Sequence, residues 1–250
     1  MAFRTRNRST TMRTLIPAAL ALLLAASPAF ADAPRSESKV LGSITAEAGQ
    51  TYGSLDSVNG AIDVREDARV SEAKTVNGAI RIGAKADVGE AATVNGSISA
   101  DAQARLGSAE TVNGSIRLAR QVQVREDVET VNGSIELGEG ASVGGDARTV
   151  NGRISLDDAR VAGVLRTSQG DISLAGASEA GGIMIDKEAR SWLSFGRQTP
   201  PTVTIGAGSK VTGPMVFERE VRLFVHQSAT IGDVSGATAV RYAGRKPPDR

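Results

Sequence analysis

The chain contains no cysteine among its 250 residues, and only 3% of them are aromatic. The absence of cysteine excludes disulfides, thiolate metal sites, a cysteine nucleophile and a lipid-modified N-terminal cysteine. So few large rings predict a thin core of small aliphatic side chains, as in a repetitive β structure. The formal net charge of +1 creates no strong field toward nucleic acid, so no nucleic-acid partner is expected.

The N-terminus has the pattern of a secretory signal peptide. A start with four arginines precedes an apolar run from Leu15 to Ala26, and Ala29-Phe30-Ala31 is a small-x-small cleavage site. The run is shorter than the ~20 residues of a spanning helix, which disfavours the alternative of an uncleaved anchor. We therefore expect residues 1–31 to be removed and the protein to be exported to the periplasm, the cell surface or the medium. No integral membrane segment is expected after cleavage.

The phrase Val-Asn-Gly-(Ala/Ser)-Ile recurs at steps of 18, 18, 18, 19 and 19 residues, counting a last copy with arginine in the fourth place. Degenerate copies at Val40 and Ser168 extend the series to eight units. A fixed short period is the signature of a solenoid. The asparagines of the phrase are Asn59, Asn77, Asn95, Asn113, Asn132 and Asn151, and the glycines are Gly60, Gly78, Gly96, Gly114, Gly133 and Gly152.

Apolar residues also repeat within each unit, as pairs with one residue between them and with a second rhythm of six. Such pairs predict short strands with one inward face. Three sixes make one coil of 18 residues, so we predict an all-β, three-sided β-solenoid (β-helix) whose handedness the sequence leaves open. The predicted core includes Val76, Ile80, Ile82, Val94, Ile98, Val112, Ile116, Val131, Ile135, Val150 and Ile154.

An antiparallel meander is the main alternative, because Asn-Gly is a strong hairpin signal. A hairpin at Asn77-Gly78 would place Val76 and Ile80 on opposite faces, with the valine among charged side chains. At a solenoid corner both side chains are expected to point inward. Asparagine and glycine both tolerate the positive φ expected at such a corner, and stacked asparagines can form an amide ladder.

The rhythm divides the chain into segments. Residues 32–185 are predicted to form solenoid repeats, and residues 186–201, with Trp192 and Phe195, a loop excursion. Strand-like sequence returns in residues 202–243, where Phe217, Phe224 and Tyr242 suit irregular capping coils. Residues 244–250 should form a disordered tail.

Candidate chemistry is sparse. The single histidine, His226, has no triad partners, and the acidic groups at Glu66-Asp67, Glu126-Asp127 and Asp157-Asp158 are best interpreted as solvated turns. We expect no catalytic residue, no metal site and no cofactor. A threonine precedes each valine from Thr75 to Thr149; this column favours a hydroxyl ladder, with an ice-binding surface as a minor alternative.

The Val-Asn-Gly-Ser-Ile units of residues 40–175 resemble the β-strand repeats of bacterial exported putative adhesins. The three-sided coil and the sequence after Thr202 bear a weaker similarity to bactofilins, polymer-forming β-solenoids that usually face the cytoplasm. The first resemblance implies a surface or periplasmic structural role, and the second implies end-to-end association.

These features favour a non-enzymatic, exported structural or adhesin-like solenoid that presents a stiff repeat surface. Envelope polysaccharide or a surface protein is the expected partner, and end-to-end self-association is a further expectation. The alternative function is a β-helix that binds or cleaves polysaccharide, which would need acidic or basic residues clustered along one side of adjacent coils.

Overall fold

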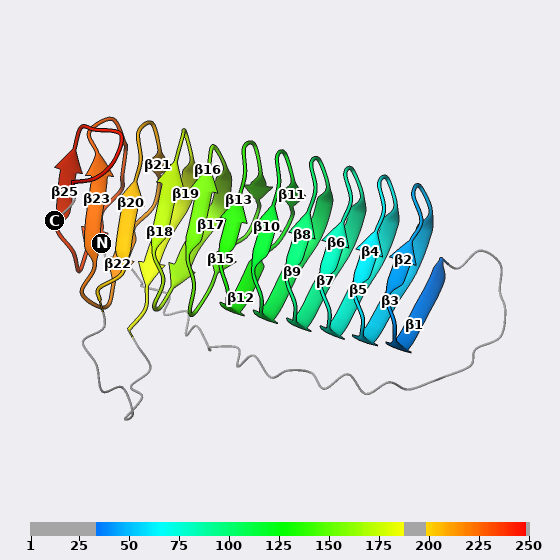
Figure 1. The fold of residues 1–250 in the computed structure, drawn as a ribbon. Coiled ribbons are helices and arrows are strands. Elements are labelled where there is room, and N and C mark those ends of the chain that lie inside the picture. Colours follow the sequence, from blue (N-terminus) through cyan, green and yellow to red (C-terminus); the bar gives the residue numbers. More distant parts are fainter. Residues whose placement is uncertain (1–33, 188–198, 249–250) are drawn as a thin grey trace, which may run out of the picture. The chain divides into compact units, whose positions relative to one another are not determined.

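The computed structural model describes residues 34–187 and 199–248, all within the unit Asp32–Arg250. The predicted signal peptide, most of the loop excursion and the last two residues therefore lie outside the described residues. The described part is all-β, with no helix and hence no helix that could cross a membrane. Every paired strand runs parallel to its neighbours, which confirms the solenoid and excludes the antiparallel meander (Figure 1).

Two parallel sheets run along the stack, and each coil contributes to both. The first sheet has 11 strands, one per coil: β2 (Ile44–Ala46), β4 (Ile62–Val64), β6 (Ile80–Ile82), β8 (Ile98–Ala100), β10 (Ile116–Leu118), β13 (Ile135–Leu137), β16 (Ile154–Asp157), β18 (Ile172–Ala175), β20 (Thr202–Ile205), β23 (Arg222–His226) and β25 (Ala239–Tyr242). We call it the short-strand sheet. The second, the long-strand sheet, contains β1 (Arg35–Leu41), β3 (Thr51–Asn59), β5 (Arg69–Asn77), β7 (Asp87–Asn95), β9 (Arg105–Asn113), β11 (Gln123–Val124), β12 (Val128–Asn132), β14 (Ser142–Val143), β15 (Ala147–Arg148), β17 (Arg160–Thr167), β19 (Glu179–Ile185), β21 (Lys210–Val211), β22 (Met215–Phe217) and β24 (Val234–Ser235).

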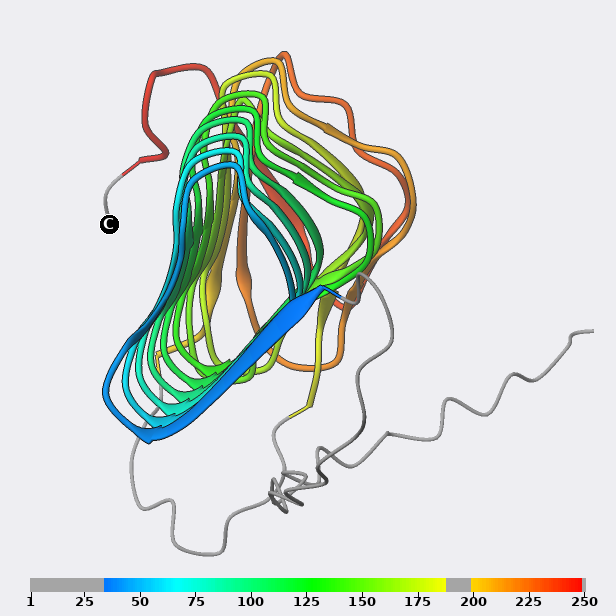
Figure 2. The ribbon, with the colours of Figure 1, turned by 90° about the vertical axis from the view of Figure 1, so that its right-hand side faces the viewer.

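The coil has the three sides that the sequence predicts, but two of them belong to one strand. The view along the stack shows the long strand bending around a corner (Figure 2). In later coils this strand is broken at the corner, as in the pair β11 and β12. Ten steps between coils at about 4.8 Å each give a stack roughly 48 Å long.

Each regular coil sends six side chains inward, two from each side. In the coil from Ile62 to Asn77 the buried residues are Ile62, Val64, Ala68, Val70, Ala73 and Thr75. The predicted core isoleucines Ile80, Ile82, Ile98, Ile116, Ile135 and Ile154 are all buried. The small side chains of the alanine columns explain how so thin an interior closes without aromatic rings.

The structure corrects the prediction that the valines of the repeated phrase point inward. Val76, Val94, Val112 and Val131 are only partly buried, and Val150 is 39% exposed. The long strands continue through the asparagine, so side chains still alternate up to that point and threonine, not valine, points inward. The bend begins only at Gly78, so the valine still belongs to the strand and faces away from the interior.

One side widens in the middle of the stack. Leu106 and Ala109 pair with Val124 and Val128, so an extra residue enters there. The wide form repeats in the next two coils and ends where Val161 and Leu165 pair with Ala180 and Ile183. Two aspartates bond to backbone N–H groups in this irregular region. Asp127 Oδ1 accepts a hydrogen bond from the Asp146 N–H at 2.7 Å, and Asp146 Oδ1 accepts one from the Val164 N–H at 2.6 Å.

The C-terminal coils are irregular, as expected. Ile172 pairs with Val203, a step of 31 residues, because the excursion is inserted in this coil. Larger side chains then enter the interior, among them Met215 and Phe217. Tyr242 lies buried in the last strand of the short-strand sheet, whereas Phe224, also named for capping, lies on the outer side and is partly exposed.

Candidate binding surfaces

The predicted asparagine ladder is present along one corner of the stack. Each Nδ2 donates to the Oδ1 of the asparagine one coil earlier, at 2.9 Å from Asn77 to Asn59 and at 2.8 Å from Asn151 to Asn132. The three bonds between them, each at 2.9 Å, join Asn95 to Asn77, Asn113 to Asn95 and Asn132 to Asn113. The ladder is exposed, so water competes for each amide and its net contribution to stability is modest.

The glycines of this corner are required for close approach. A Cβ on Gly96 would lie 1.9 Å from the Gly78 carbonyl oxygen, and Gly78, Gly114, Gly133 and Gly152 meet the preceding glycine in the same way. None of these glycines has a positive φ, and neither do the asparagines. The expected conformational reason for Asn-Gly is therefore wrong; the backbones of successive coils simply leave no room for a side chain.

The threonines occupy the interior beside this corner. Thr75, Thr93 and Thr111 are 5% exposed or less, and each Oγ1 donates to a glycine carbonyl of the preceding coil at 2.9–3.0 Å. Thr130 and Thr149 do the same. The hydroxyls thus join coil to coil through the backbone. Buried side chains cannot form an ice-binding array, so that alternative is excluded for this column.

Positive φ values occur at a different corner, between the short strand and the long strand. Asp67, Lys85, Gln103 and Gln121 have φ between 56° and 63°, and glycines fill the same position at Gly49 and Gly140. We call this the left-handed corner. Sequence analysis missed it, although glycine alternating with Asp, Lys and Gln at one repeat position was a usable signal, since the left-handed region favours glycine and short polar side chains.

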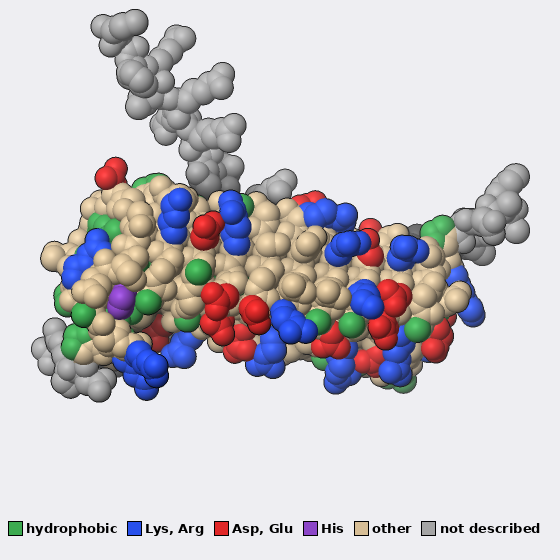
Figure 3. All heavy atoms as spheres, turned by 90° about the horizontal axis from the view of Figure 1, so that it is seen from above, with side chains coloured by type: hydrophobic (Ala, Val, Ile, Leu, Met, Phe, Trp, Pro, Cys, Tyr) green, Lys and Arg blue, Asp and Glu red, His purple; other side chains and the backbone are tan. Residues whose placement is uncertain are grey.

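A polar groove of about 920 Å³ follows the left-handed corner. Its walls carry Arg69, Asp87, Arg105 and Gln123 from the starts of successive long strands, facing the corner residues. Arg69, Asp87 and Arg105 form no side-chain hydrogen bond or ion pair with any described residue. Figure 3 looks onto this side of the stack and shows charged side chains along it. The groove therefore offers side chains of both signs that are free to take a ligand.

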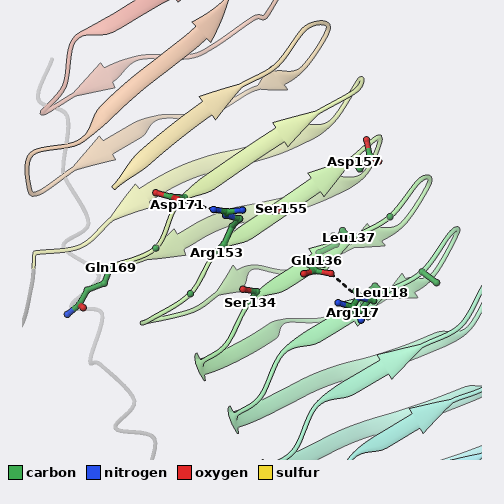
Figure 4. Close-up of a pocket in the computed structure, with 14 residues that line it drawn as sticks. Arg117, Leu118, Ser134, Glu136, Leu137, Arg153, Ser155, Asp157, Gln169 and Asp171 are labelled. Carbon is green, nitrogen blue, oxygen red and sulfur yellow. Dashed lines mark hydrogen bonds and ion pairs between the residues drawn. The ribbon is translucent and has the colours of Figure 1, made fainter. Parts of the chain in front are cut away.

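The outer face of the short-strand sheet differs because its charges are paired. Arg81 bonds Asp63 at 3.1 Å, and Arg117 Nε bonds Glu136 at 2.8 Å. A second depression, of about 700 Å³, lies between Arg117 and Asp171 (Figure 4). In it Arg153 bonds Asp171 at 3.3 Å, so both arginines of this depression are already paired with a carboxylate.

The third outer face carries an ionic row on the long strands. Lys74 contacts Glu90 at 2.9 Å and Glu72 at 3.1 Å; burial alone would lower the pKa of Lys74, but these hydrogen bonds raise it. Glu110, further along, has no such cation. Burial, followed by the charges of Glu129, Glu90 and Asp127, raises its pKa, and only Lys74 opposes this.

The remaining candidate residues serve local structure. His226 Nδ1 lies 2.8 Å from Ser228 Oγ, and its ring meets Tyr242 edge-on at 5.2 Å. Asp158 Oδ1 accepts from the Ala177 N–H at 2.8 Å. Within residues 34–187 and 199–248, no group of three or more His, Cys, Asp or Glu side chains is arranged to hold a metal ion.

No family model, no curated protein and no solved structure matches the chain.

Proposed function

We propose that the protein is an exported, non-enzymatic structural or adhesin-like β-solenoid that presents a stiff repeat surface to the cell envelope. The observation that carries this proposal is the uninterrupted register of the first coils. Asparagine pairs with asparagine across β3, β5, β7 and β9, and threonine with threonine and alanine with alanine across β5, β7 and β9. A stack held by backbone, hydroxyl and amide bonds at every step presents the same surface positions at a fixed spacing.

Export is part of the proposal and rests on the sequence. The basic start, the short apolar run and the small residues at Ala29 and Ala31 favour cleavage before Asp32. The likeness of the Val-Asn-Gly-Ser-Ile units to exported putative adhesins supports the same location. Fractionation of the producing cell, with N-terminal sequencing of the recovered protein, tests it. Intact protein in the cytoplasm would contradict it.

Within this function, we assign the contact surface to the groove of the left-handed corner. Its arginines are free, whereas those on the short-strand face are engaged by carboxylates. A polar groove that repeats once per coil suits an extended polymer with polar groups repeating along its length, and envelope polysaccharide is the polymer expected at an exported protein. This groove is also what favours the second candidate function, polysaccharide binding.

Binding to purified envelope polysaccharide, measured by co-sedimentation at two salt concentrations, tests the assignment. Arg69→Gln with Arg105→Gln should weaken binding, because both free cations of the groove are lost. The matched control is Arg81→Gln with Arg117→Gln, which removes the same charge from the short-strand face. Equal binding by both double variants would exclude the groove, and absence of binding by the unaltered protein would exclude polysaccharide as its partner.

A further inference from the structure

We propose that Asn151 is a site of selective, non-enzymatic deamidation, and that the ladder protects the asparagines before it. The inference goes beyond the proposed structural function and does not depend on it. All six asparagines of the ladder precede glycine, the neighbour that least obstructs attack by the following backbone nitrogen on the side-chain amide. Local sequence alone would make them similar.

The reaction needs only water. The Gly152 backbone nitrogen attacks Cγ of Asn151 and forms an N–Cγ bond. The Cγ–Nδ2 bond breaks, and Nδ2 leaves as ammonia, taking up the proton lost from the Gly152 nitrogen. Water then opens the resulting succinimide at one of its two carbonyls, giving aspartate or isoaspartate. The net change is one amide replaced by one carboxylate.

The nucleophile is held in place at the first four corners of the ladder. The N–H groups of Gly60, Gly78, Gly96 and Gly114 each donate to the backbone oxygen of the next asparagine at 3.1 Å. Attack requires this nitrogen to leave its partner and turn toward Cγ, so each of these bonds must open first. Among the described residues the Gly133 and Gly152 N–H groups form no bond of this length, and Gln169 stands where the asparagine after Asn151 would be.

The electrophile is also held at the interior steps. Asn77, Asn95, Asn113 and Asn132 both donate through Nδ2 and accept through Oδ1, so their amides are fixed on two sides. Asn151 only donates, because no asparagine follows it. The backbone agrees with this difference. The five earlier asparagines are the last residues of strands β3, β5, β7, β9 and β12, whereas Asn151 lies outside any strand in an isolated bridge.

Deamidation of Asn151 would expose the preceding asparagine of the ladder to the same reaction. A carboxylate cannot donate to Asn132 Oδ1, so Asn132 would become the new end of the ladder. Isoaspartate would in addition lengthen the backbone at a corner where Gly152 already lies against the Gly133 carbonyl. The inferred order of reaction is therefore Asn151 first and Asn132 second.

The repeat supplies an internal control. The tetrapeptide Thr-Val-Asn-Gly is identical at residues 75–78 and 149–152, and trypsin releases each copy in its own peptide, residues 75–81 and 149–153. The purified protein is aged at 37 °C and mildly alkaline pH, both folded and in concentrated urea, and deamidation is followed by mass spectrometry with chromatographic separation of isoaspartate. In the folded protein Asn151 should react at least about tenfold faster than Asn77, as expected when local opening limits the protected site. In urea the two rates should converge.

A variant checks that the ladder is the cause. Gln169→Asn places another amide above Asn151 and should slow its deamidation in the folded protein, whereas Gln169→Ala, the matched control, should leave the rate unchanged. Equal rates at Asn77 and Asn151 in the folded protein would overturn the proposal, and this comparison needs no variant to fold.

Discussion

Each glycine of the asparagine corner lies against the backbone of the coil before it, and this contact sets a steric limit at a single atom. Gly96→Ala would place a methyl group 1.9 Å from a carbonyl oxygen, so one coil must shift relative to the next. We expect a loss of about 1–3 kcal/mol, in the range of overpacked interiors. Gly138→Ala is the control, because its nearest neighbour would lie at 3.4 Å and should be tolerated. Thermal unfolding followed by circular dichroism compares the two, and equal melting temperatures would contradict the steric explanation.

The finding that threonine faces the interior and the following valine faces outward can be tested by substitution. Ile98 is fully buried, so Ile98→Asp places an unpaired charge in a core without a partner and should unfold the stack. Val94 lies on the partly exposed outer side, and Val94→Asp should leave the protein folded with at most a small loss of stability. Urea denaturation of both variants measures the difference. If Val94→Asp were as damaging as Ile98→Asp, the valine would have to face the interior after all.

At the scale of the strands, most ion pairs join neighbouring coils. Glu110 on β9 follows Ala92 on β7 and precedes Glu129 on β12, so no cation faces it in its row. Its pKa is raised, which means that the folded state binds the proton more readily than the unfolded chain. The ionised carboxylate therefore costs stability above the folded pKa, and this cost disappears once the pH falls below the unfolded value.

Glu110→Gln should accordingly raise stability at neutral pH, and the advantage over the unaltered protein should shrink as the pH falls toward the ordinary glutamate range. Unfolding curves at several pH values measure it. Glu136→Gln serves as the control with the opposite sign, because Glu136 is bonded to Arg117 and gains nothing from losing its charge. An advantage of Glu110→Gln that persists unchanged at low pH would point to a cause other than ionisation.

The strands also show what sequence periodicity can and cannot provide. The period of 18 predicts the parallel stack, the isoleucine columns and the amide ladder, because each follows from identical residues recurring at one coil position. Periodicity does not locate the corner to within a residue. Strand β5 continues through Asn77, so Val76 keeps the alternation of the strand and faces outward beside the inward-facing Thr75. The groove was missed for a related reason: Asp67, Lys85 and Gln103 share a backbone conformation, not a side-chain type.

At the scale of the whole stack, the ends differ from the middle. The columns of inward-facing side chains reach their N-terminal edge at β1. There they hold Arg35, Glu37 and Lys39, which pair with the buried residues Tyr52, Leu55 and Ser57 of β3. Charged side chains at inward positions of an edge strand oppose the addition of another chain. This arrangement weighs against end-to-end association through β1, the expectation drawn from the polymer-forming solenoids.

A variant that carries Arg35→Val, Glu37→Leu and Lys39→Thr would continue the neighbouring columns to the edge. We expect it to associate end to end with rising concentration, while the unaltered protein sediments as a monomer. Analytical ultracentrifugation and electron microscopy of both proteins measure this. Filaments of the unaltered protein would show that the charges do not block the edge.

The widened side that begins between Val124 and Val128 is copied by two further coils before it ends. Two wide coils pair with each other without a change of register. The mismatch between wide and narrow coils is therefore confined to the two borders of the block of wide coils. One of these borders is the register shift between Val161 and Val164. In a linear array with nearest-neighbour coupling, the penalty then depends on the number of borders and not on the length of the block. Duplication of a wide coil would lengthen the rod without adding a border, so molecules of this kind can change girth along their axis at a nearly constant energetic cost.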